Sequence, residues 1–131
     1  MAVEVIDASA LAAVLFGEPD GEAVASRATG RDLVAPSLIR YELASVFLKK
    51  ARRYPEQGPG FLEALRLYPR LEVDEVQVPI VELGLLAERV EVTAYDAAYL
   101  WLADHLAAPL ITLDDRVGAA ARRLELPESP D

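Results

Sequence analysis

The sequence predicts an α/β fold in which helices cover a parallel sheet. Short β-branched or apolar runs alternate with Ala- and Leu-rich segments of helical periodicity, and the first and last of these runs pass into a helix through an aspartate. Strands that alternate with helices in this way form a parallel sheet. A length of 131 residues with 53% hydrophobic residues suffices for one compact domain, and we expect a single domain over residues 1–131.

Four short segments are predicted as strands. The first carries Val3, Val5 and Ile6 and ends on Asp7, and the second is closed by Pro36. The predicted strands are residues 3–7, 33–35, 71–78 and 110–112.

Helical periodicity and cap residues predict the remaining elements. Ser37 is expected as the N-cap of the longest helix, and Pro79 suits the first turn of another. The Pro- and Gly-rich stretch Tyr54–Gly60 is predicted as a loop between two helices that pair as a hairpin. The polar tail, residues 127–131, is expected to fray. The predicted helices are residues 8–16, 21–28, 37–53, 61–67, 79–89, 93–106 and 114–124.

The composition excludes several kinds of site. The chain has no cysteine, which rules out disulfides, thiolate catalysis and cysteine-based metal centres and favours a cytoplasmic location. Its one histidine, His105, cannot build a His-rich metal site and is expected near an exposed helix end. The start of the chain lacks a signal-peptide pattern and no window reaches the ~18 apolar residues of a membrane span, so no membrane association is expected.

The balance of charge is strongly acidic. A formal charge of −9, from 22 acids against 13 bases, argues against broad, phosphate-driven binding of nucleic acid. A basic cluster, residues 49–53, ends the longest predicted helix. Cations are favourable at a helix C-terminus in any case, so the role of this cluster stays open.

Three aspartates are predicted at the starts of helices. Asp7 and Asp114 each follow a strand and each suits an N-cap, and Asp96 follows Thr93 at the spacing of a capping box. In a parallel sheet the carboxyl ends of the strands share one edge, where ligands bind. We therefore expect these acids, from distant parts of the chain, to converge at that edge.

Glu42 is predicted at the border of the apolar stripe of the longest helix, between Ile39 and Val46. A carboxylate turned toward a core must be paired, protonated or bound to a metal ion. The nearest base on the same helix is Lys49, two turns away, so a salt bridge at the rim is the alternative explanation.

A cluster of these acids would require a cation. Carboxylates about 4 Å apart repel one another by about 4 kcal/mol per pair at an effective dielectric constant of about 20. Because the chain has no cysteine and one histidine, an all-oxygen site is expected, and such a site favours a hard ion, Mg²⁺ or Mn²⁺. The residues thus predict a metal-dependent enzyme that acts on a phosphodiester or phosphate.

The chain carries four motifs in a fixed order that together span most of its length. They are Val5-Ile6-Asp7-Ala8-Ser9-Ala10-Leu11, Tyr41-Glu42-Leu43, Tyr95-Asp96-Ala97-Ala98-Tyr99 and Leu110-Ile111-Thr112-Leu113-Asp114. In this order they resemble the PIN-domain ribonucleases, particularly the VapC-type toxins. The resemblance implies a three-layer α/β/α sandwich with a central parallel sheet, and a cytoplasmic endoribonuclease that requires Mg²⁺ or Mn²⁺.

The same resemblance implies the roles of individual residues. RNA would be cleaved internally by metal-activated water, leaving a 5′-phosphate and a 3′-hydroxyl. Glu42 would hold a water and help to deprotonate it, and the hydroxyl residues would position water or phosphate. Asp115 is a weaker fifth acid outside this core set, and its role stays open. The implied catalytic acids are Asp7, Glu42, Asp96 and Asp114, the metal ligands Asp7, Asp96 and Asp114, and the hydroxyl residues Ser9 and Thr112.

The resemblance also implies an RNA substrate, a cognate antitoxin that covers the acids, and a homodimer, with the apolar faces of residues 12–16 and 39–47 as candidate contact surfaces. One alternative is a degenerate PIN-like domain that only binds a partner. A second is a receiver-type, phosphoryl-accepting domain, which needs an early acidic pair and a late lysine. Asp7 has no acidic neighbour and no lysine follows Lys50, which disfavours the second.

Overall fold

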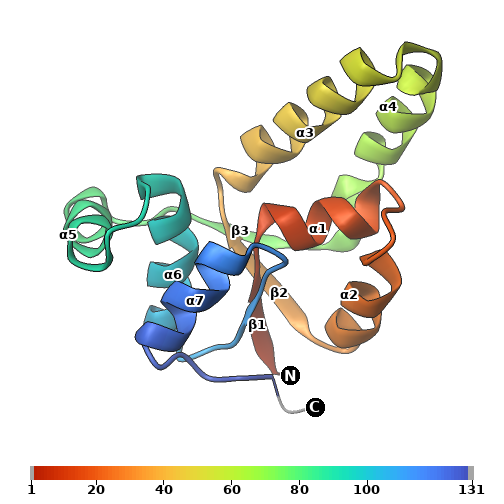
Figure 1. Ribbon diagram of the computed structural model, residues 1–131. Helices are drawn as coiled ribbons and strands as arrows, with labels where there is room; N and C mark the ends of the chain where they lie inside the picture. Colours follow the sequence, from red (N-terminus) through yellow and green to blue (C-terminus); the bar gives the residue numbers. More distant parts are fainter. Residues whose placement is uncertain (1, 130–131) are drawn as a thin grey trace.

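The computed structural model describes residues 2–129 and contains a four-stranded parallel sheet (Figure 1). The strands lie in the order β3-β2-β1-β4, and the central strand β1 pairs Val5 with Val34 on one side and with Leu110 on the other. The strands are β1 (Val3–Ile6), β2 (Asp32–Pro36), β3 (Asp74–Val76) and β4 (Leu110–Ile111).

Helices cover both faces of this sheet. Figure 1 shows the sheet nearly edge-on, with α1 and α2 to its right and α6 and α7 to its left. The predicted three-layer α/β/α architecture is therefore confirmed. None of the described helices combines the length and the apolar character needed to cross a lipid bilayer. The helices are α1 (Ala8–Leu15), α2 (Gly21–Ala28), α3 (Ile39–Arg53), α4 (Gly58–Arg66), α5 (Ile80–Val90), α6 (Ala94–Leu106) and α7 (Asp115–Arg123), with short 3₁₀ helices at Pro55–Gln57 and Tyr68–Leu71.

The order of the strands creates a binding edge. The chain adds β2 and β3 on one side of β1 and then returns through α5 and α6 to place β4 on the other side. Because parallel crossovers are right-handed, this return reverses the face on which the helices pack. Ligands bind in open α/β sheets at the carboxyl edge where the strand order reverses. Here that point lies between the ends of β1 and β4.

The core lies between the sheet and the helices. Val5 and Ile6 of β1 are fully buried, as is Leu100 of α6. Each such side chain contributes about 1.5–3 kcal/mol by leaving water. The candidate contact faces on residues 12–16 and 39–47 also belong largely to this core, since Ala12, Leu15, Ile39 and Leu43 are buried.

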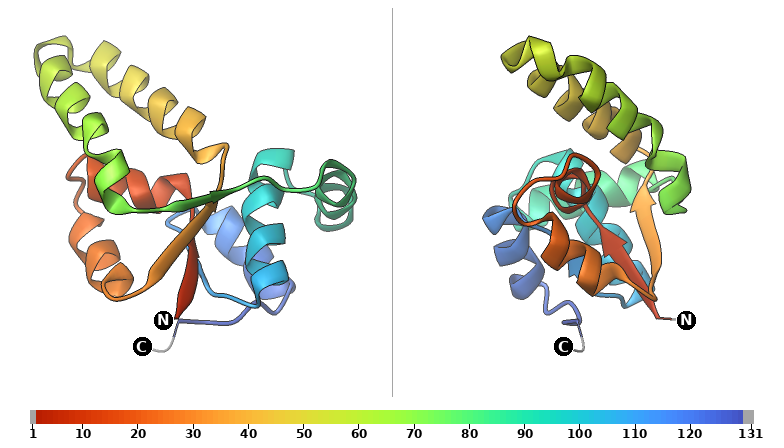
Figure 2. Two further views of the ribbon diagram at one scale, coloured as in Figure 1. Left: turned by 180° about the vertical axis from the view of Figure 1, so that it is seen from behind. Right: turned by 90° about the vertical axis from the view of Figure 1, so that its right-hand side faces the viewer.

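Helices α3 and α4 form the predicted helical hairpin, which projects from the body of the molecule (Figure 2). Its base is held against α1 by an edge-to-face contact between Phe16 and Phe61, with ring centroids 6.2 Å apart. The Lys50 ammonium group lies over both rings and pairs with Glu18 at 2.6 Å. Lys50, which belongs to the basic cluster at residues 49–53, thus has a structural role.

The predicted loop at Tyr54–Gly60 is wrong. Residues Pro55–Gln57 form a 3₁₀ turn, and α4 begins at Gly58 rather than near residue 61. Proline fixes φ near its helical value and lacks only an N–H that the first turn leaves unpaired anyway. Pro55 and Pro59 both lie in such first turns, so they start helices here instead of breaking them.

Two other boundaries differ from the prediction. Ser37 does not cap α3, which starts at Ile39, because the Ser37 N–H donates to the Val76 carbonyl at 3.0 Å and so extends the pairing of β2 with β3. The strand predicted at residues 71–78 is limited to Asp74–Val76. The start of that segment is not a strand, because a 3₁₀ helix ends at Leu71 and the backbone of Glu72 is left-handed, with φ 53°.

The C-terminal segment contacts β1 through Ser129. The Ser129 hydroxyl donates to both carboxylate oxygens of Glu4, at 3.1 and 3.2 Å. Glu4 is only 1% exposed and also pairs with Arg27 at 3.5 Å and Arg31 at 3.2 Å. A buried carboxylate needs partners, and the chain end supplies one. The predicted fraying of residues 127–131 stays a prediction, and residues 130–131 lie outside the described part of the chain.

Candidate functional site

A cavity of about 650 Å³ opens at the carboxyl edge of the sheet. Its walls come from the starts of α1, α3, α6 and α7, four segments that are far apart in sequence. All four predicted catalytic acids line it: Asp7, Glu42, Asp96 and Asp114. The predicted convergence of acids is therefore present in the fold.

Asp7 is the most buried of these acids, with 4% of its surface exposed. Its N–H donates to the Ile111 carbonyl at 3.0 Å, which extends the pairing of β1 with β4 by one residue. Its Oδ1 caps α1 by accepting from the Ala10 N–H at 3.0 Å. Burial raises the pKa of Asp7, and hydrogen bonds to the carboxylate oppose that rise only in part.

Ser9 and Thr112 hold the Asp7 carboxylate from two sides. The Ser9 hydroxyl donates to Asp7 Oδ1 at 2.7 Å, and the Thr112 hydroxyl donates to Asp7 Oδ2. Each hydroxyl oxygen also accepts a backbone N–H from the turn after β4, from Leu113 and Asp114 respectively, at 3.0 Å. Because both hydroxyl hydrogens point to Asp7, these residues fix that carboxylate and attach the β4–α7 turn to it.

Asp114 and Asp96 begin their helices as predicted. Asp114 Oδ1 caps α7 by accepting the N–H groups of Arg116 and Val117 at 2.8 and 3.1 Å. Thr93 caps α6 by accepting the Asp96 N–H at 3.1 Å, so the Asp96 side chain is not used as the cap. Burial, and next the charge of Asp114, raise the pKa of Asp96.

Glu42 lies half-buried on the first turn of α3, as its place on the apolar stripe predicted. Its partner is Tyr99 of α6, whose hydroxyl donates to Glu42 Oε1 at 2.5 Å. The rim salt bridge to Lys49 is not formed in the described part of the chain, although Lys49 lines the same cavity. Burial raises the pKa of Glu42, the Tyr99 hydrogen bond lowers it, and the charges of Asp7 and Asp96 raise it further.

Tyr99 is a site residue that sequence reasoning missed. Burial and the adjacent Glu42 raise its pKa well above the ordinary value, so the phenol keeps its proton and remains a donor. The available signal was spacing, because Tyr99 follows Asp96 by three residues and so lies on the same face of α6.

The composition of the site suits a hard cation. Burial raises the pKa values of Asp7, Glu42 and Asp96, and the charges of neighbouring acids raise them further; a divalent ion is the group that relieves such repulsion. The donors are carboxylate oxygens, which Mg²⁺ and Mn²⁺ prefer. Within residues 2–129, no three acidic or histidine side chains are arranged so that they could coordinate a metal ion without moving. Ion binding would therefore require rotation of one or more carboxylates toward a common centre.

Asp115, whose role the sequence left open, does not line this cavity. Its exposed side chain lines a separate hollow of about 720 Å³ between α7 and the C-terminal segment. Asp115 is thus a natural reference residue, adjacent to Asp114 in sequence but facing different surroundings.

Two comparisons with known proteins agree on one family, and a third finds a protein of the same fold. The PIN domain family matches residues 5–123. The chain is 35% identical to Ribonuclease VapC3 of Pyrobaculum aerophilum, over 84% of this chain and 88% of the relative. It is 36% identical to Ribonuclease VapC9 of Mycobacterium tuberculosis and to VapC ribonuclease Mb0985 of Mycobacterium bovis, over 86% of this chain and 87% of each relative. The crystal structure of PAE2754 from Pyrobaculum aerophilum superimposes with a TM-score of 0.74 over 94% of this chain and 92% of that one, at 22% identity.

Proposed function

The chain belongs to the PIN-domain family, and from that premise we propose that it is a metal-dependent endoribonuclease, the toxin of a toxin–antitoxin pair. One observation carries the proposal: four carboxylates from distant segments line a single cavity at the carboxyl edge of the sheet. The names of the relatives, which describe ribonucleases, support the choice of RNA as substrate.

Three of the acids would hold the ion, which we propose is Mg²⁺ or Mn²⁺. Asp7 is fixed in place by Ser9 and Thr112, and Asp114 has one carboxylate oxygen, Oδ1, committed to its cap. Asp96 is free of capping and faces Asp114 closely enough for their charges to interact. When bound, the ion supplies positive charge that stabilises the negative charge developing on the phosphate.

Glu42 is the proposed general base. Its carboxylate is oriented by the Tyr99 hydroxyl, which leaves Oε2 to accept a proton from the attacking water. The water oxygen forms the new bond to phosphorus as the bond to the ribose 3′-oxygen breaks, and the leaving 3′-oxygen takes a proton from solvent. The products then carry a 5′-phosphate and a 3′-hydroxyl.

The proposed partners are a cognate antitoxin that covers the acids and a second copy of this chain. The residue 12–16 and 39–47 faces are largely core, so a dimer would need other apolar surface. Helix α5 offers such surface, since Ile80, Val81 and Leu85 are 82%, 70% and 62% exposed.

The direct test is cleavage of total RNA with Mg²⁺ or Mn²⁺, followed by mapping of the 5′ ends. Asp7→Asn, Asp96→Asn and Asp114→Asn should each lower the rate by at least roughly 100-fold, because each removes a charge that holds the ion. Asparagine also serves as an N-cap, so the fold should survive these changes.

The matched control is Asp115→Asn, which removes an acid from the same helix start that does not line the acidic cavity. It should leave the rate within about threefold of the parent. A parent protein that binds partners but cleaves no RNA with either ion would favour the degenerate, binding-only alternative. Equal losses in Asp114→Asn and Asp115→Asn would contradict the assigned site.

A further inference from the structure

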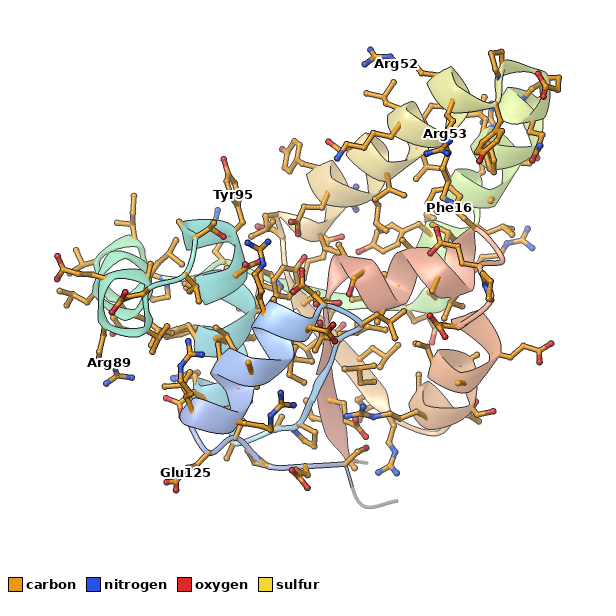
Figure 3. All side chains as sticks on the ribbon, in the orientation of Figure 1. Phe16, Arg52, Arg53, Arg89, Tyr95 and Glu125 are labelled. Carbon is orange, nitrogen blue, oxygen red and sulfur yellow. The ribbon has the colours of Figure 1, made fainter. Side chains whose placement is uncertain are left out.

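Two tyrosines at the rim of the acidic cavity have exposed rings. Tyr41 of α3 is 76% exposed and Tyr95 of α6 is 66% exposed, and both line the cavity that holds the four acids. In the sequence each directly precedes a site acid, Glu42 and Asp96 respectively. Figure 3 shows the Tyr95 side chain pointing away from the body of the molecule.

These two rings have no evident part in the fold. Tyr99 is buried and donates to Glu42, and the half-buried Tyr68 donates to Glu75 at 2.7 Å. In contrast, the hydroxyls of Tyr41 and Tyr95 make no hydrogen bond within residues 2–129, and neither ring packs on another ring. Large exposed aromatic side chains beside a cavity indicate a binding surface.

Cations lie at two sides of the same surface. Lys49, two turns along α3 from Glu42, lines the acidic cavity. A second cavity of about 480 Å³ adjoins it at Asp96 and is lined by Arg116 and Arg123 of α7. The central acids are thus flanked by positive charge, an arrangement that suits a phosphate chain entering and leaving the acidic centre.

We propose that Tyr41 and Tyr95 stack on unpaired bases of the RNA next to the phosphate that reaches the acids. This inference rests on the proposed ribonuclease function. An aromatic face accepts any base, whereas the bases of a duplex are already stacked and their faces are not accessible. The rings would thus select exposed loops or ends without selecting a sequence.

The test compares two ligands of equal charge. One is a fluorescent uridine oligomer of about ten nucleotides, and the other is the same ribose-phosphate chain without bases. Binding is measured by fluorescence anisotropy in EDTA, which prevents cleavage. The parent should bind the uridine oligomer at least roughly tenfold more tightly, because only that oligomer can stack.

The double variant Tyr41→Ala/Tyr95→Ala should lose this preference and bind both ligands with similar affinity. Tyr41→Phe/Tyr95→Phe should retain it, because phenylalanine keeps the ring. Tyr54→Ala is the matched control: Tyr54 is also exposed, at 41%, but it packs under Arg53 at the end of α3, away from the acidic cavity.

A preference that persists in the double alanine variant, or that is absent from the parent, would overturn the inference. The same is true if the rings serve only a protein partner, since RNA binding would then be unchanged by the alanines. Cleavage by the parent with Mg²⁺ or Mn²⁺ is scored separately. A parent that cleaves RNA but shows no preference for bases contradicts the stacking role while leaving the ribonuclease function standing.

Discussion

The Tyr99 hydroxyl donates a hydrogen bond of 2.5 Å to Glu42 Oε1, and this bond joins α6 to α3 across 57 residues of sequence. It orients Glu42, whose side chain, unlike those of Asp7 and Asp114, caps no helix. It also opposes the effect of burial on the pKa of Glu42, because a donated hydrogen bond favours the charged carboxylate.

Tyr99→Phe removes this bond while keeping the ring. The pKa of Glu42 should then rise further, so the acid limb of the pH profile of kcat/KM should move to higher pH. The free energy of unfolding should fall by about 1.5 kcal/mol, as for a lost hydrogen bond to a charged group. Tyr54→Phe, at an exposed position, is the control for both measurements. An unshifted acid limb would show that Glu42 does not act as the base.

Glu42→Gln should stabilise the metal-free protein. The folded-state pKa of Glu42 lies above its unfolded value of 4.5, so the ionised carboxylate destabilises the fold at neutral pH, and this penalty vanishes once both states are protonated. The variant should therefore unfold at higher urea than the parent at pH 7, by under about 1 kcal/mol after solvent screening, and should lose this advantage as the pH falls toward 4.5. A variant less stable than the parent at pH 7 in EDTA would contradict the direction of the shift.

Mg²⁺ or Mn²⁺ should raise the melting temperature of the parent. An ion that binds only the folded state stabilises it by about 2.7 kcal/mol at 100 times its Kd, which corresponds to a rise of several degrees for a domain of this size. The combined variant Asp7→Asn/Asp114→Asn should show little rise, whereas Asp115→Asn should respond as the parent does. Equal shifts in all three proteins would place the bound ion elsewhere on the chain.

Glu4→Gln should destabilise the fold at the opposite end of β1. Glu4 is buried and joins Arg27, Arg31 and Ser129, so neutralising it removes a buried negative charge that pairs with two guanidinium groups. Breaking one side of a buried ion pair costs on the order of 3 kcal/mol. Urea unfolding measures the loss, and Glu22→Gln on the exposed face of α2 should change stability by less than about 0.5 kcal/mol. A similar small effect in Glu4→Gln would mean that water replaces the carboxylate without cost.

Two glycine substitutions should act in opposite directions. A Cβ at Gly21 would lie 2.4 Å from the Ala13 carbonyl oxygen, so Gly21→Ala should destabilise the fold by about 1–3 kcal/mol by forcing α1 and α2 apart. A Cβ at Gly84, within α5, would meet nothing within 4 Å. Gly84→Ala should therefore stabilise the fold by about 0.5–1 kcal/mol through helix propensity. Thermal unfolding of both variants gives the comparison, and a stable Gly21→Ala would contradict the close approach of α1 to α2.

Much of the fold was predictable because it depends on local chemistry. The β-branched run before Asp7 forms a strand, and Asp7, Thr93 and Asp114 cap the helices that follow. An N-cap prefers a short polar side chain at the point where a strand turns into a helix. Since parallel strands end at one edge, the same local rule predicted that acids far apart in sequence would meet there.

Predictions from local sequence patterns were wrong where the same residue type is compatible with two different structures. Proline and glycine predicted a loop at Tyr54–Gly60, yet the same residues suit the first turns of the 3₁₀ helix and of α4. Ser37 has the chemistry of a cap, but the pairing of its N–H with Val76 takes it into the sheet. At Ser37 a contact with a distant segment determined the conformation, whereas at Tyr54–Gly60 the same local pattern is compatible with a loop and with a helix start.

The sequence by itself determined which acids exist, in what order, and that each follows a strand or opens a helix. Only the tertiary structure decided how they are held: Asp7 between the hydroxyls of Ser9 and Thr112, and Glu42 against Tyr99. The physical reason is that hydrogen bonds such as Thr112 to Asp7, 105 residues apart, depend on the packing of whole elements, and no local pattern encodes that packing.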